Sequence, residues 1–170
     1  MKRPIILSTT ILTLFLGGAR SAFADTIFVS NEKDNTVTVV DGKTLEVIKT
    51  IPTARRPRGI IASPDGKEVY VAAGDGDIMD VIDTQKLEVT RHLDSGPDPE
   101  LMAVDPKGEK IYIANEDDSL VTIMDIKSGD VLGEVPVGVE PEGMTVSPDN
   151  KYTVATSEST AWPMSSTMRR

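Results

Sequence analysis

The chain of 170 residues contains no cysteine and one histidine, and aromatic residues make up only 4% of it. Without cysteine the chain cannot form a disulfide, a zinc–thiolate site or a thioether attachment to haem. His92 alone cannot build a zinc site of several histidines, and no Gly-x-Ser-x-Gly sequence supplies a hydrolase nucleophile. We therefore expect His92 to be an ordinary, partly exposed strand residue, and we expect packing and sheet hydrogen bonds to hold the fold.

Basic residues are in deficit, because 18 Lys and Arg stand against 27 Asp and Glu and give a net charge of −9. Residues 1–24 carry three of the basic residues and no acidic ones, so the rest of the chain has a net charge of −12. Such a surface repels nucleic acid and anionic lipid, and it suits cations or a basic protein partner. Acidity also serves solubility alone, and charge does not decide between these roles.

Residues 1–24 have the three-part pattern of a secretory signal peptide. Lys2 and Arg3 form a basic start, residues 5–16 are mostly apolar, and residues 22–24 (Ala-Phe-Ala) match a cleavage site. A membrane anchor is the alternative, but the apolar stretch is shorter than the ~20 residues that a spanning helix needs. We expect export to the periplasm, Asp25 as the first mature residue, and no membrane span after cleavage.

The remaining chain repeats itself with a period of 42 residues. Val39-Val40-Asp41 returns at 81–83 and 123–125, and Ser63-Pro64-Asp65-Gly66 returns at 105–108 and 147–150. A period near 40 made of short β-branched strands and turns is typical of a β-propeller, with one period per four-stranded blade. We predict an all-β fold, a partial β-propeller of about three and a half four-stranded blades over residues 25–160.

One complete repeat shows how the strands divide. Strands are expected at 101–104, 110–114, 120–125 and 130–137, separated by loops rich in Gly, Pro, Asp and Asn. By the same division the chain starts on a second strand at 26–30, and the inner neighbour of that strand would come from a distant part of a closed ring.

The repeat resembles the YVTN-type β-propeller repeat, on the evidence of Val69-Tyr70-Val71-Ala72, the Val-Ile-Asp strand ends and the Ser-Pro-Asp-Gly turns. Residues 31–35, 96–100, 114–118 and 137–144 are similar to loops of exported propellers associated with PQQ-dependent alcohol catabolism. This resemblance implies a non-catalytic periplasmic binding or scaffold protein without a cofactor of its own. Its implied partner is a periplasmic PQQ-dependent dehydrogenase or a cytochrome c.

Proteins of that family close a ring of about seven blades, whereas residues 161–170 depart from the repeat. A third strand ending in Asp near position 167 is expected there, and the chain has Pro163 instead. Read from the third base of codon 161, the codons permit an apolar strand that ends in that Asp. We hypothesise that a frameshift before Ala161 replaced the remaining blades with an aberrant tail, leaving a truncated copy without function; a genuine short protein is the alternative.

An unclosed arc would leave strand edges and blade faces uncovered. We accordingly expect the last blade to lack its outer strands. We also expect a marginally stable, aggregation-prone product unless it self-associates.

Charged residues recur in two sets of loops, those that enter the inner strands near Pro57, Pro99 and Pro141 and those between second and third strands. In four-stranded blades both sets lie on one face of the disc. We therefore predict a charged docking face near the central channel, although charged loops also serve solvation alone. Its residues are Arg55, Arg56, Arg58, Asp98, Glu100, Glu116, Asp117, Asp118, Glu140 and Glu142.

A metal-dependent hydrolase of lactonase type is the alternative function. Such propellers bind a divalent metal in the channel through acidic and amide ligands, and Asn31, Asn115, Glu100 and Glu142 are of the right types. Repetition alone also explains these positions, and residues 74–77 (Gly-Asp-Gly-Asp) resemble a calcium loop only weakly. We assign no catalytic residue and no metal ligand.

The frameshift hypothesis makes a prediction at the level of DNA. The alternative reading frame past the stop codon should encode further Ser-Pro-Asp-Gly repeats at the same spacing. Resequencing of the locus checks this, and an alternative frame without such repeats would rule out the hypothesis.

Overall fold

The structure is a computed structural model that describes residues 25–159 and 166–169. The predicted signal peptide at 1–24 lies outside the described residues, as do residues 160–165 and 170 of the predicted tail. The described part contains 14 strands and one short 3₁₀ helix, η1 (Gly74–Gly76). It includes no helix with the length and apolar character needed to cross a membrane.

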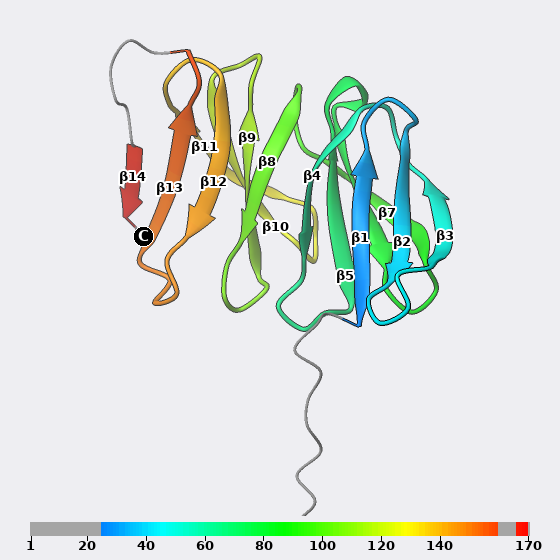
Figure 1. Cartoon of the computed structure of the whole chain (residues 1–170). Helices are drawn as coiled ribbons and strands as arrows, with labels where there is room; N and C mark the ends of the chain where they lie inside the picture. The colour runs from blue at the N-terminus through cyan, green and yellow to red at the C-terminus, as the bar shows by residue number, and fades with distance from the viewer. Residues whose placement is uncertain (1–24, 160–165, 170) are drawn as a thin grey trace, which may run out of the picture.

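The strands form four antiparallel sheets that stand side by side as the blades of an arc (Figure 1). The first blade comprises β1 (Thr26–Asn31), β2 (Thr36–Asp41) and β3 (Val47–Pro52). The second comprises β4 (Pro57–Ala62), β5 (Glu68–Ala73), β6 (Ile78–Asp83) and β7 (Glu88–Asp94). The third comprises β8 (Pro99–Val104), β9 (Lys110–Asn115), β10 (Leu120–Asp125) and β11 (Val131–Pro136). The last comprises β12 (Pro141–Val146), β13 (Tyr152–Ser157) and β14 (Ser166–Arg169).

This arrangement confirms the predicted all-β, partial propeller. The strands β1, β4, β8 and β12 neighbour one another and form the inner side of the arc (Figure 1). In the complete third repeat, the four strands lie within one or two residues of the expected bounds. Within the described residues β1 pairs only with β2, as expected for a second strand without its inner neighbour.

The last blade differs from expectation, because residues 166–169 supply the third strand that the broken repeat had led us to exclude. β14 pairs antiparallel with β13, so the prediction that this blade lacks a third strand is wrong. In the preceding blade Lys110 pairs with Asp125, and the period of the repeat would place Thr167 opposite Tyr152. Arg169 pairs with Tyr152 instead, a shift of two residues that an alternating strand accommodates without changing faces.

The apolar core lies between blades, because the middle strands bury both of their faces. Tyr70 and Ala72 of β5 pack toward the third blade, and Val69 and Val71 pack toward the first. Successive strand residues point to opposite sides, so a strand between two blades must be apolar at nearly every position. Burial of each Val side chain contributes roughly 1.5–3 kcal/mol, which makes the contacts between blades the main source of stability.

The predicted turns form with the expected geometry. Position 66 of the repeat has positive φ in every copy, at 71° in Gly66, 71° in Gly108 and 59° in Asn150, and Gly and Asn tolerate this conformation best. At the end of β2, the Asp41 side chain accepts hydrogen bonds from the backbone N–H groups of residues 43 and 44. These bonds lower the pKa of Asp41 and fix the turn that follows.

Gly59 on β4 provides a test of the packing between the second and third blades. A Cβ added at Gly59 would collide with the backbone carbonyl of Glu100, which cannot move without displacing β8. Gly59→Ala should therefore lower the free energy of unfolding by about 2 kcal/mol or more. Gly133→Ala on β11 is the matched control, because an added Cβ meets nothing within 4 Å there. Thermal or urea unfolding measures both, and equal stability of the two variants would contradict the predicted close contact.

Candidate functional site

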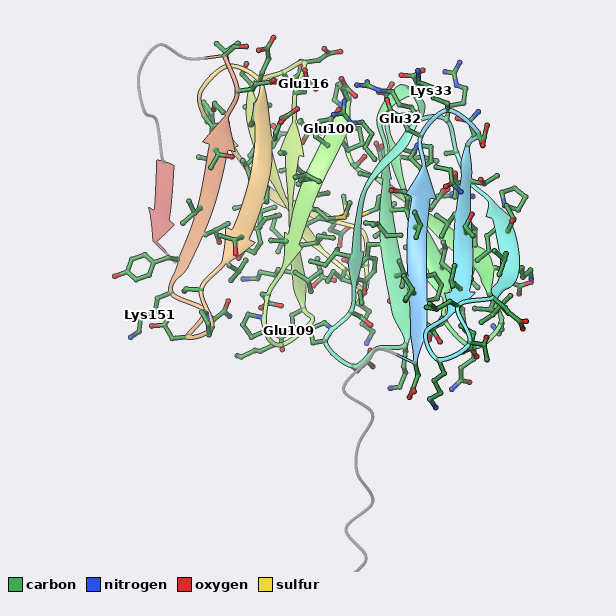
Figure 2. All side chains as sticks on the ribbon, viewed as in Figure 1. Glu32, Lys33, Glu100, Glu109, Glu116 and Lys151 are labelled. Atoms are coloured by element: carbon green, nitrogen blue, oxygen red, sulfur yellow. The ribbon has the colours of Figure 1, made fainter. Side chains whose placement is uncertain are left out.

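The two sets of charged loops lie on the same face, as the repeat predicted. In the second and third blades, a backbone N–H of the loop between the second and third strands donates to a carbonyl of the loop that enters the inner strand. The bond from Gly74 to Arg56 and the bond from Glu116 to Asp98 are both 3.0 Å long. Figure 2 shows Glu32, Glu100 and Glu116 at this end of the sheets, with Glu109 and Lys151 at the opposite end. We call these ends the upper and the lower face.

The residue before each of β4, β8 and β12 has a left-handed backbone. The φ angle is 59° for Arg56, 39° for Asp98 and 53° for Glu140, a region that residues other than glycine rarely occupy. Two side-chain hydrogen bonds hold this conformation, because Asn35 Oδ1 accepts from Arg56 N–H at 2.8 Å and Asp77 Oδ1 accepts from Asp98 N–H at 3.2 Å. The loops therefore present their charged residues from fixed positions.

Arg56 lies among four carboxylates. Its Nη1 is 2.9 Å from Asp98 Oδ1 and its Nη2 is 3.3 Å from Glu100 Oε1, with Glu32 at 3.5 Å and Asp75 at 3.6 Å. Burial alone would lower the pKa of Arg56, but the charges of Asp98 and Glu100 outweigh it and raise that pKa. Arg56 is therefore charged and is neutralised within the chain.

Arg58 extends this network across three inner strands. It projects from β4, its Nε lies 2.7 Å from Glu100 Oε2 on β8, and its Nη2 lies 3.7 Å from Glu142 Oε1 on β12. Arg58, Glu100 and Glu142 also line a cavity of about 280 Å³ that reaches Ser30 of β1. The network formed by Arg56, Arg58, Asp98, Glu100, Glu116 and Glu142 thus joins the blades at the upper end of the channel; we call it the inner network.

Glu100 is the buried centre of the inner network, with 1% of its surface exposed. Burial, the neighbouring Glu116 carboxyl group and the nearby charge of Asp98 raise the pKa of Glu100 to about 8, against the opposing effect of Arg58 and Arg56. Desolvation thus makes Glu100 harder to ionise than an ordinary glutamate.

The carboxylates of the inner network also have the grouping of a metal site. Ligand oxygens of Asp98, Glu100 and Glu116 lie within 4.8 Å of one another. The Arg56 guanidinium is already in contact with two of these residues, at 2.9 Å and 3.3 Å. The arginine supplies the positive charge that a cation would otherwise bring, so the geometry favours an internal ion-pair network.

The other predicted docking residues lie at the periphery. Arg55 donates to the carbonyl oxygen of Asp75 at 2.7 Å, Glu140 is half-buried, and Asp117 and Asp118 are exposed. Exposed carboxylates from three blades surround the inner network; we call them the acidic rim, and its residues are Glu32, Asp34, Asp75, Asp77, Asp117 and Asp118.

The amides that a lactonase-type site would require are used within the sheets. Asn31 Nδ2 donates to the hydroxyl groups of Thr36 and Thr38. Asn115 is buried, donates to the carbonyl oxygens of residues 95 and 97, and accepts from Thr122 at 2.8 Å. Asn115 thereby holds the loop that presents Asp98.

Asp80, which the sequence did not point to, holds the loop before β4 in the second blade, as Asn115 holds the loop before β8 in the third. It is fully buried, accepts from Ala54 N–H at 2.7 Å, and lies 2.6 Å from Nδ1 of the exposed His92. His92 is thus a strand residue, as expected, with a specific partner. The available signal was that Asp80 replaces the Thr found at the same position of the other repeats, Thr38 and Thr122.

The raised pKa of Glu100 predicts the pH dependence of stability. Because folding raises the pKa of Glu100 from an ordinary value near 4.5 to about 8, the folded state binds more protons between these values. The free energy of unfolding should therefore fall by at least about 1 kcal/mol as pH rises through this window. Glu100→Gln, which keeps the neutral shape, should lose this slope in urea unfolding. Glu134→Gln on the exposed face of β11 is the control that should retain it, and parallel slopes in all three proteins would contradict the raised pKa of Glu100.

The fold matches solved structures that span more than this chain. It superimposes on Kuenenia stuttgartiensis hydrazine synthase with a TM-score of 0.76 at 24% identity, covering 81% of this chain and 40% of that one. It also superimposes on dihydro-heme d1 dehydrogenase NirN in complex with DHE, with a TM-score of 0.66 at 22% identity, covering 78% and 30%. At such identities the likeness shows the fold alone.

Sequence comparison identifies the family. No curated protein sequence matches the chain. The family model of the YNCE-like beta-propeller matches residues 6–107, which is more than half of the chain. The chain therefore belongs to the YNCE-like β-propeller family.

Proposed function

We propose that the chain is an exported, non-catalytic β-propeller that binds a protein partner in PQQ-dependent alcohol oxidation. The partner is a periplasmic PQQ-dependent dehydrogenase or a cytochrome c, and it docks on the acidic rim of the upper face through a basic surface of its own. The signal-peptide pattern of residues 1–24 supports export, and the loop resemblance supports the metabolic setting.

One observation carries the proposal, namely that Arg56 and Arg58 are paired within the chain. Their guanidinium groups contact Asp98, Glu100 and Glu142 at 2.7–3.7 Å, so their charges are compensated inside the inner network. The exposed carboxylates of the acidic rim then outnumber the exposed basic residues of the upper face, Lys33 and Arg55. Complementary charge of this kind speeds association and selects the partner.

The proposed role is non-catalytic because the candidate catalytic groups already have partners within the chain. Glu100 is held by two arginines. Asn115 has its amide group committed to the backbone of the loop at 95–97 and to Thr122. These contacts support a positioning role, in which the inner network fixes the blades beneath a docking face.

A binding measurement tests the proposed function. The purified chain should bind a PQQ-dependent alcohol dehydrogenase or a cytochrome c from the same organism, with an affinity that falls as salt rises. The double variant Asp117→Asn/Asp118→Asn should weaken binding about three- to tenfold at low ionic strength, because each exposed charge contributes up to ~1 kcal/mol.

The matched control removes the same charge from the lower face, through Glu109→Gln/Asp130→Asn. This variant should bind as the parent does. Failure to bind either protein at low salt, or equal losses in both double variants, would exclude docking on the acidic rim.

A further inference from the structure

A second concave site lies on the lower face, between the second and third blades. Its volume is about 790 Å³, within the range of ~300–1,000 Å³ that is usual for small-molecule sites. We call it the lower cavity. It is built from the β4–β5, β8–β9 and β10–β11 turns together with side chains of β5 and β7, and it lies at the end of the molecule that carries Glu109 and Lys151 in Figure 2.

The floor of the lower cavity is fixed by contacts that cross the two blades. Tyr70 is 2% exposed, and its hydroxyl group donates to Glu68 Oε2 at 2.8 Å. Arg91 pairs with the same carboxylate at 3.2 Å and donates to the carbonyl oxygen of Ile126 at 2.7 Å. Burial raises the pKa of Tyr70, so the phenol stays neutral. Tyr70 and Ile126, 2% and 5% exposed, therefore close the floor, and the exposed Pro64 supplies an apolar part of the wall.

The rim of the lower cavity is basic. Lys67, Lys107 and Lys127 line it together with Arg91, in a chain whose net charge is −9. Lys67 pairs with Asp65 at 2.9 Å and Arg91 with Glu68, whereas Lys107 and Lys127 form no salt bridge within residues 25–159 and 166–169. The four basic side chains outnumber the three carboxylates of the lining, Asp65, Glu68 and Asp83, so the edge of the concave wall has a positive potential.

We propose that the lower cavity binds a small organic anion, a carboxylic acid with an aromatic or aliphatic body. Its carboxylate lies between Lys107 and Lys127, and its apolar body lies against Pro64, above the floor that Tyr70 and Ile126 close. Charge-assisted hydrogen bonds to the two lysines fix the acid group, and the remaining cavity volume accepts the body. Polyanions are disfavoured, because the acidic surface beyond the cavity repels a long chain of phosphates.

This site is independent of the docking face. The inner network and the acidic rim lie on the upper face, and none of their residues lines the lower cavity. Loss of protein binding and loss of anion binding therefore have separate causes and separate variants.

Titration with benzoate, an aromatic carboxylate, tests the proposal. Benzoate should produce saturable NMR chemical-shift changes or heat, and the neutral isostere benzamide should bind at least about tenfold more weakly because it lacks the charge. Lys107→Gln/Lys127→Gln should lower benzoate affinity by at least about tenfold. Both lysines are exposed and lie in turns, so the double variant should keep the unfolding transition of the parent.

Lys151→Gln is the matched control, since Lys151 lies on the same face, outside the cavity, and pairs with Asp149 at 3.2 Å. It should bind benzoate as the parent does. Three results would overturn the proposal: no saturable binding up to about 10 mM benzoate, equal affinity for benzamide, or unchanged affinity in the Lys107→Gln/Lys127→Gln variant.

Discussion

Packing between blades is the constraint on which the rest of the structure depends. β5 and β9 are each buried on both faces, so Tyr70 and Ala72 contact one neighbouring blade while Val69 and Val71 contact the other. A strand enclosed in this way has no position from which a polar side chain reaches solvent except at its ends. The charged residues of β5 and β9, Glu68 and Lys110, therefore lie at the first position of each strand, and the repeat aligns the charged loops from blade to blade.

The inner network connects the inner strands of different blades through ion pairs. Arg58 of β4 reaches Glu100 of β8 and Glu142 of β12, and Arg56 reaches Asp98 and Glu100. Buried charges are costly unless they are paired and hydrogen-bonded, and removing one partner exposes that cost. The raised pKa of Glu100 couples this contact between blades to pH.

The upper face and the lower cavity differ in electrostatic character. The upper face pairs Arg56 and Arg58 internally and leaves carboxylates exposed, whereas the lower cavity leaves Lys107 and Lys127 without a salt bridge within the described residues. The proposed docking surface and the proposed anion site therefore lie at opposite ends of the same repeat. The difference comes from residues that vary between copies of the repeat, such as Lys107 where the other copies have Asp65 and Asp149.

The sequence by itself determined the blade repeat, most strand positions and the face on which the charged loops meet. Alternation and turn residues such as Gly66 act locally, so their effect can be read along the chain. Which charges compensate one another was decided only by the tertiary structure. Arg56 and Asp98 form a contact although they are 42 residues apart, and Asp80 accepts a hydrogen bond from Ala54 in another part of the chain. No local pattern encodes these contacts. Burial of Glu100 likewise depends on the approach of Arg56, Arg58 and Glu116 from other strands and loops, because desolvation is a property of the assembled blades.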